Sequence, residues 1–242
     1  MPIGALAVAG GNFLLYVLLR STHRWLAYLQ LFLLFIFAFV VTDRSFSVFY
    51  LLMFIIAILI TELNTNVKTE QQSTFSAGKF DNGSFPKTIL FMSLGVVLYI
   101  FIAVISTRVG GNIVGTPDLA LQTTDDISKL IKPTLQASLG IVENFFTFAV
   151  FEAVMVFGLA IPIIGRAINF TFIIPMLLVG FLMGVFHVSA YSVSLSLIIW
   201  ATMAFSLFIA TRYFFKDSLV ADTAHYLNNL IVSASRNLAL VV

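Results

Sequence analysis

Long apolar runs alternate along the chain with shorter polar segments, and the runs have the length of membrane-spanning helices. A helix needs about 20 mostly apolar residues to cross a bilayer. The pattern predicts an all-α membrane helix bundle with about eight transmembrane helices, at residues 3–19, 25–42, 46–62, 88–106, 140–164, 168–188, 191–212 and 216–235.

One of the connecting segments has a helical pattern of its own. Within residues 107–139, apolar and polar positions alternate at helical spacing over about 119–132, and Pro133 follows. This predicts an amphipathic helix lying on the membrane surface, which Pro133 ends or kinks.

Composition agrees with a polytopic membrane protein. The chain is 60% hydrophobic and only 10% charged, with a mean hydropathy of +1.04, whereas a soluble domain carries about 25% charged residues. We therefore expect a multi-pass integral membrane protein in contact with lipids, forming a single membrane domain over residues 1–242. A net charge of +2 gives no indication of a nucleic-acid partner, and the absence of Cys excludes disulfides and thiolate chemistry.

Three of the ionisable residues inside predicted membrane helices are candidate site residues, because charge there is costly and usually marks a site. They are Glu143, His187 and His225. Glu143 is near the start of 140–164 and His187 near the end of 168–188, which places both near one membrane face. At 1.5 Å per residue, His225 lies roughly 14 Å and Asn229 roughly 20 Å into the helix that enters from the opposite face. The spacing predicts that these four side chains share one pocket.

Helix 216–235 also carries a polar stripe at spacings of three and four residues, made of Ser218, Asp222, His225, Asn229, Ser233 and Arg236. Such a stripe faces the bundle interior or a water-filled cavity; the alternative is a helix lying flat with the stripe in water. Glu152, nine residues after Glu143, is about 180° round its helix and is expected to make a different contact.

Each site residue also has a purely structural interpretation. Glu143 could be an N-terminal charge that favours the helix dipole and reaches toward water. His187 could be a packed or interfacial histidine. His225 and Asn229 could form an interhelical hydrogen-bond pair.

The order of these residues resembles the CPBP intramembrane proteases, the family of CAAX prenyl-protein proteases and bacteriocin-processing enzymes. That family carries Glu-Glu-x-x-x-Arg, then Phe-x-x-x-His, then His-x-x-x-Asn. The third motif is complete in His225-Tyr-Leu-Asn-Asn229, and the second is similar in Met183-Gly-Val-Phe-His187. The first begins with Glu143, but Asn144 and Phe148 replace its second Glu and its Arg. The similarity covers about residues 135–240.

The resemblance implies an intramembrane endopeptidase that cleaves a membrane-associated or lipidated peptide. Glu143, helped by His187, would activate water, and His225 with Asn229 would bind the oxyanion. Asn144 and Asp222 are possible supporting residues. A metal-free mechanism without a cofactor is expected; the alternative is a zinc site with Glu143, His187 and His225 as ligands.

Two other functions remain open. Asn144 and Phe148 are also compatible with an inactive protein of the same fold that acts as a membrane binding or scaffold protein. The polar stripe of 216–235 could alternatively line the path of a small transporter, although paired broken helices are not evident.

Overall fold

The computed structural model describes residues 3–22, 24–41, 44–67, 85–110, 126–160, 172–190 and 194–239. Within these ranges the regular structure is helical, without a strand: α1 (Ile3–Thr22), α2 (Arg24–Val41), α3 (Arg44–Val67), α4 (Phe85–Ile105), the π-helical turn η2 (Ser106–Gly110), α5 (Asp126–Ala160), α7 (Ile173–Ala190), α8 (Leu195–Phe215) and α9 (Leu219–Ala239).

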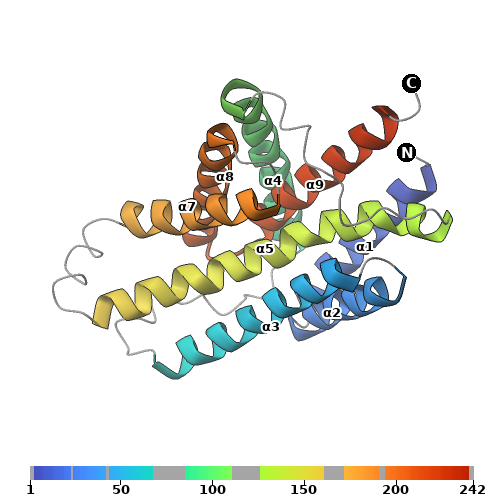
Figure 1. Ribbon diagram of the computed structural model, residues 1–242. Helices are drawn as coiled ribbons and strands as arrows, with labels where there is room; N and C mark the ends of the chain where they lie inside the picture. Colours follow the sequence, from blue (N-terminus) through green and yellow to red (C-terminus); the bar gives the residue numbers. More distant parts are fainter. Residues whose placement is uncertain are drawn as a thin grey trace.

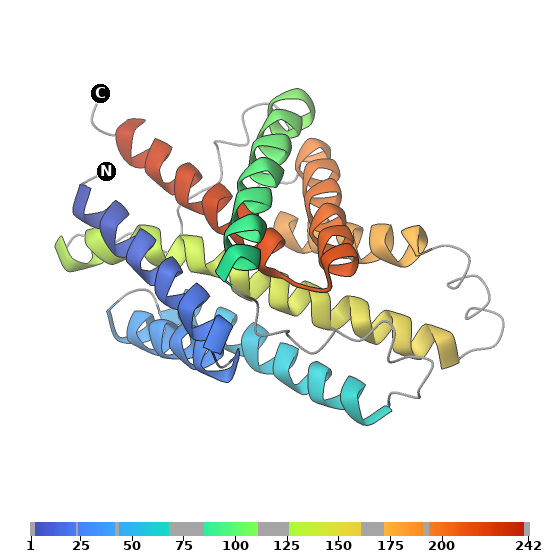
Figure 2. The ribbon, with the colours of Figure 1, turned by 180° about the vertical axis from the view of Figure 1, so that it is seen from behind.

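Helix α5 is the axis around which the other helices are arranged. Figure 1 shows α5 running through the molecule, with α2 and α3 on one side and α7, α8, α4 and α9 on the other. It contacts α1, α2, α3, α7, α8 and α9 directly, while α4 packs on α9. Seen from behind, α4 and α8 stand across the direction of α5 (Figure 2). Side chains at the centre of α5 are therefore surrounded by several helices.

Four helical segments in the described residues are long and apolar enough to cross a membrane: Ile3–Ser21, Phe85–Val109, Leu130–Val156 and Leu195–Phe215. Three shorter apolar helices are Trp25–Phe39, Val48–Leu63 and Ile173–His187. Large apolar side chains are exposed on α1 to α4, α7 and α8. A lipid environment would cover these faces, and polar contacts are left to the interior.

The sequence-based interpretation of residues 107–139 is wrong for its second half. Residues 126–132 are not a separate surface helix; they form the first two turns of α5, and Pro133 lies inside that helix. Residues 119–125 lie outside the described part. A proline removes only one backbone hydrogen bond from a helix, and tertiary packing offsets that loss. Here Leu135, Ala137 and Ser138 directly after Pro133 are fully buried. Glu143 is consequently in the middle of its helix rather than near the start.

Close packing of α7 on α8 depends on two glycines one turn apart. A Cβ at Gly180 would lie 2.4 Å from Ser206 Oγ, and one at Gly184 would lie 2.9 Å from the Ile198 carbonyl oxygen. Small residues at this spacing allow helix backbones to approach in membranes. The approach brings α8, with its aromatic side chains, against the end of α7 that carries His187.

The polar stripe of α9 faces the bundle interior, as predicted. Ser218, Asp222, His225 and Ser233 are buried, and Asn229 is half-buried; the side chain of Arg236 is outside the described residues. The helix contacts α4, α5 and α8. Its other face is not in water either, because Leu219, Val220 and Tyr226 belong to an apolar cluster with residues of α1 and α4.

Candidate functional site

Glu143 lies at the centre of a buried cluster of hydrogen-bonding side chains. The Tyr50 hydroxyl donates to Glu143 Oε1 at 3.2 Å. The Nε2 atoms of His225 and His187 lie 3.2 Å and 3.8 Å from Glu143 Oε2. Glu143 is only 6% exposed, so these protein groups are its immediate surroundings. Four helices, α3, α5, α7 and α9, meet at this carboxylate.

The position of His225 is set by packing against α5 and α8. Gly140 is one turn before Glu143 on α5, and a Cβ there would lie 2.8 Å from Cγ of His225. The missing side chain lets the His225 ring lie against α5. The ring also stacks on Phe208 of α8, with centroids 4.9 Å apart and an interplanar angle of 22°. These contacts direct Nε2 of His225 at Glu143.

His187 is oriented by its own helix. Its Nδ1 is 2.8 Å from the carbonyl oxygen of Met183, and since a carbonyl only accepts, Nδ1 donates. The ring lies 5.2 Å from the ring of Phe205. With Nδ1 committed to the helix backbone, Nε2 is the nitrogen that faces Glu143.

A second layer of polar contacts continues from His225. Its Nδ1 is 3.0 Å from Asn144 Oδ1, and Asn144 Nδ2 donates to Asp222 Oδ1 at 3.2 Å. Tyr16 and Ser218 donate to Asp222 Oδ2 at 2.9 Å and 2.7 Å. Both possible supporting residues, Asn144 and Asp222, thus lie on the side of His225 away from Glu143.

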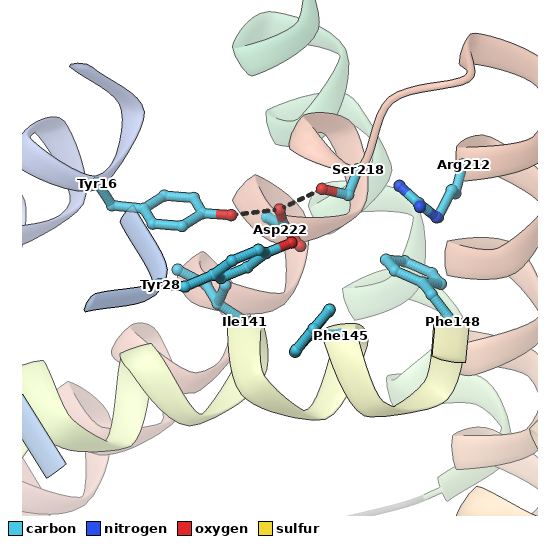
Figure 3. A pocket seen from close by; sticks show the side chains of 8 residues that line it. All are labelled: Tyr16, Tyr28, Ile141, Phe145, Phe148, Arg212, Ser218 and Asp222. Carbon is cyan, nitrogen blue, oxygen red and sulfur yellow. Dashed lines mark hydrogen bonds between the residues drawn. The ribbon is translucent and has the colours of Figure 1, made fainter. Parts of the chain in front are cut away.

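A small pocket opens beside this second layer. Tyr16, Tyr28, Ile141, Phe145, Phe148, Arg212, Ser218 and Asp222 line it, and it has room for about one water molecule. Figure 3 shows Tyr16 and Ser218 reaching Asp222 from different sides, next to Ile141, Phe145 and Phe148 of α5. Its size excludes a substrate, so the pocket can hold at most solvent at Asp222.

Asn229 is the predicted site residue that the structure does not bring to Glu143. Its Nδ2 donates to the carbonyl oxygen of Gln136 at 3.3 Å. Gln136 is seven residues before Glu143, about 10 Å along α5. The predicted four-residue pocket thus contains Glu143, His187 and His225 without Asn229. The cause is the start of α5: with Glu143 at mid-helix, His225 rather than Asn229 reaches its level.

Phe148, which stands where the first motif of the CPBP proteases has an Arg, contacts an arginine from another helix. Phe148 is buried, and the Arg212 guanidinium of α8 lies over its ring, 4.9 Å from the centroid. Arg212 also forms a 3.2 Å ion pair with Glu152. Glu152 therefore makes a different contact from Glu143, as its position round the helix predicted.

The predicted zinc alternative would use the same Glu143, His187 and His225 as ligands. Across the described ranges, no group of three or more His, Cys, Asp or Glu side chains has an arrangement suited to a metal ion. Zinc stays an alternative prediction, as does the expectation of a site without a cofactor.

Tyr50 and Tyr16 are contacts that the sequence pattern did not reveal. Each stands in an apolar stretch, although Arg20 follows Tyr16 by one helical turn, and tyrosine is common in such helices because its ring is apolar and only its tip is polar. One indication of these contacts was present in the sequence: Glu143 and Asp222 were expected to be buried, and buried carboxylates need hydrogen-bond donors.

Comparisons with protein-family models, curated proteins and solved structures found no match. The resemblance to the CPBP proteases therefore stays a prediction that rests on the motif residues.

Proposed function

We propose that this chain is an intramembrane endopeptidase, similar to the CPBP proteases, that hydrolyses a peptide bond in a membrane-associated or lipidated substrate. The proposal includes a multi-pass topology in which the eight α-helices of the described ranges cross the membrane. Its main support is one geometric fact: two imidazole Nε2 atoms from different helices converge on one oxygen of a buried glutamate.

In the proposed reaction, Glu143 takes a proton from a water molecule, and the resulting hydroxide attacks the peptide carbonyl. The carbonyl oxygen becomes an oxyanion, which needs donors close to Glu143. Collapse of the intermediate breaks the C–N bond, and the proton held by Glu143 passes to the leaving amine. The products are a carboxylic acid and an amine, so one water is consumed per bond cleaved.

The donors in this proposal differ from those implied by the resemblance. His187 and His225 present Nε2, and Tyr50 presents its hydroxyl, all within hydrogen-bonding or ion-pairing range of Glu143. Asn229 is engaged with the Gln136 backbone and has no role in the reaction. Tyr50 is therefore one proposed oxyanion donor, and His225 is the other when its ring is protonated at both nitrogens; His187 assists the base.

The test uses purified protein in liposomes with an internally quenched peptide that ends in a prenylated cysteine and three further residues. We expect cleavage by the wild type and none by the Glu143→Ala, His187→Ala double variant. Thr223→Val is a matched control, since the Thr223 hydroxyl bonds only its own helix at Leu219. Undiminished cleavage by the double variant would refute the proposal.

One observation favours a second candidate, a catalytically inactive membrane scaffold. Asn144 stands where the related motif has a second carboxylate, and it is engaged on both sides by His225 and Asp222. In that case the cluster only joins α5, α7 and α9. Cleavage of the reporter peptide that depends on Glu143 would exclude it.

A further inference from the structure

Asp222 is the end point of a chain of buried contacts that leads to the back of His225. Asn144 lies between them, with Nδ2 directed at Asp222 Oδ1 and Oδ1 directed at His225 Nδ1. Asn144 has no exposed surface, Asp222 is 2% exposed and His225 is 6% exposed. Bulk water is therefore kept away from these three side chains, and each group must match the hydrogen-bonding capacity of the next.

The order of donors and acceptors along this chain follows from Asp222. Asp222 accepts hydrogen bonds on both of its oxygens, as an ionised carboxylate does, so Asn144 presents its NH₂ group to it. The amide oxygen of Asn144 then faces His225, and that oxygen also only accepts. Nδ1 of His225 must therefore carry a proton.

Asp222 is itself held so that one oxygen remains for Asn144. The hydroxyls of Tyr16 and Ser218 both donate to Oδ2, which leaves Oδ1 for the amide. Arg20 donates to the Ser218 hydroxyl at 3.2 Å and pairs with Asp217 in the turn before α9. Helix α1 thus holds the carboxylate directly through Tyr16 and indirectly through Arg20 and Ser218.

We propose that Asp222 is a positioning residue that, acting through Asn144, keeps Nδ1 of His225 protonated and so directs the Nε2 atom of that ring to Glu143. With Nδ1 occupied, the only nitrogen of His225 that can exchange a proton is Nε2, which lies 3.2 Å from Glu143 Oε2. The catalytic consequence rests on the proposed peptidase function, whereas the tautomer does not.

The tautomer can be measured without a substrate. The chain has three histidines, so ¹⁵N labelling of the imidazoles gives few signals, and His187→Gln and His225→Gln assign them. We expect the wild-type His225 to carry its proton on Nδ1 whenever the ring is neutral. A bare Nδ1 in the wild type would overturn the proposal, and this result needs no variant to fold.

Two variants test the role of the carboxylate. Asp222→Ala frees the Asn144 amide to turn over, and Asn144→Leu removes the acceptor with a side chain of similar size. In both we expect His225 to shift its proton toward Nε2, and in Thr223→Val we expect no shift. An unchanged tautomer in the variants would contradict the proposal.

Cleavage of the prenylated reporter separates this inference from the proposed function. If the chain is a peptidase, Asp222→Ala should lower kcat roughly 10- to 100-fold, as when the orienting partner of a metal-bound histidine is lost, with KM unchanged. No cleavage by the wild type, together with the expected tautomer shift, would refute the peptidase and support the positioning role. Unchanged kcat in Asp222→Ala, with an active wild type, would count against it.

Discussion

Glu143 and Glu152 are two buried carboxylates on the same helix, and their partners differ in kind. Glu152 pairs with Arg212 at 3.2 Å, and a guanidinium keeps its charge at every physiological pH. Glu143 faces two imidazoles and a phenol hydroxyl. Each of those groups can give or take a proton in a reaction. Glu152 therefore has the partner of a structural ion pair, and Glu143 has the partners of an acid–base site.

Burial does not separate these two carboxylates, since Glu143 is 6% and Glu152 is 8% exposed. The two carboxylates differ in what their partners, Arg212 and His225, contact next. Arg212 lies over the ring of Phe148, so the partner of Glu152 is a cation that packs on an aromatic ring. His225 continues through Asn144 to Asp222. A buried charge is thus better judged by what its partner can do than by how deeply it lies.

The largest effect is expected from breaking the Glu152 pair. Arg212→Met removes the cation that pairs with a buried carboxylate and should lower the free energy of unfolding by about 3–5 kcal/mol. Adding Glu152→Leu removes the second charge, so the double variant should recover part of the loss. Unfolding in detergent measures both, and equal stability of the single variant and the wild type would contradict a structural role.

The His187→Gln substitution tests the other carboxylate. Glutamine can still reach Glu143 with an amide group but cannot exchange a proton. We expect cleavage of the reporter to fall about 10²-fold or more, the contribution of one acid–base group, with little change in stability. If stability falls as far as in Arg212→Met while cleavage persists, the two carboxylates do not differ as described.

A smaller effect is expected at Gly140. A methyl group there would lie 2.8 Å from the His225 ring, and overpacking of this kind costs about 1–3 kcal/mol. Gly140→Ala should therefore displace His225 and slow cleavage without touching the Glu152 pair. The control is Gly10→Ala, because a Cβ at Gly10 meets nothing within 4 Å. Equal cleavage by the two alanine variants would show that the His225 position is unimportant.

The smallest effect is expected at Tyr50. Tyr50→Phe removes one hydrogen bond to Glu143 Oε1, worth about 0.5–1.5 kcal/mol. If the hydroxyl binds the oxyanion as proposed, the loss should appear in kcat rather than in KM, roughly 10-fold at most. A change confined to KM would instead assign Tyr50 to substrate binding.

Much of the helical architecture could be predicted, because apolar runs of membrane length leave few alternatives to a helix. The proximity of Glu143, His187 and His225 could also be predicted from depth alone. The rotation of each helix about its axis could not. Tyr50 and Tyr16 were missed for this reason, since an apolar helix carries little sign of which face is inward.

The error at Asn229 has a different origin. Pro133 is a reasonable helix end when only local rules apply, but α5 continues through it, and the side chains that follow it, such as Leu135 and Ala137, are buried. Because α5 begins at Asp126, Glu143 lies deeper in its helix than predicted. The α9 residue at its level is therefore His225 and not Asn229. A prediction of which residues on two helices lie at the same depth thus fails when one helix start is misplaced. A prediction from the position of a residue around its helix axis, such as that for Glu152, does not depend on the helix start.

The central claim is that Glu143 takes part in chemistry and Glu152 does not. The most direct measurement is the cleavage rate of the prenylated reporter by Glu143→Gln and Glu152→Gln, compared at equal amounts of folded protein in the same liposomes. We predict no detectable cleavage by Glu143→Gln and a near wild-type kcat for Glu152→Gln. Equal rates for the two variants would contradict the claim.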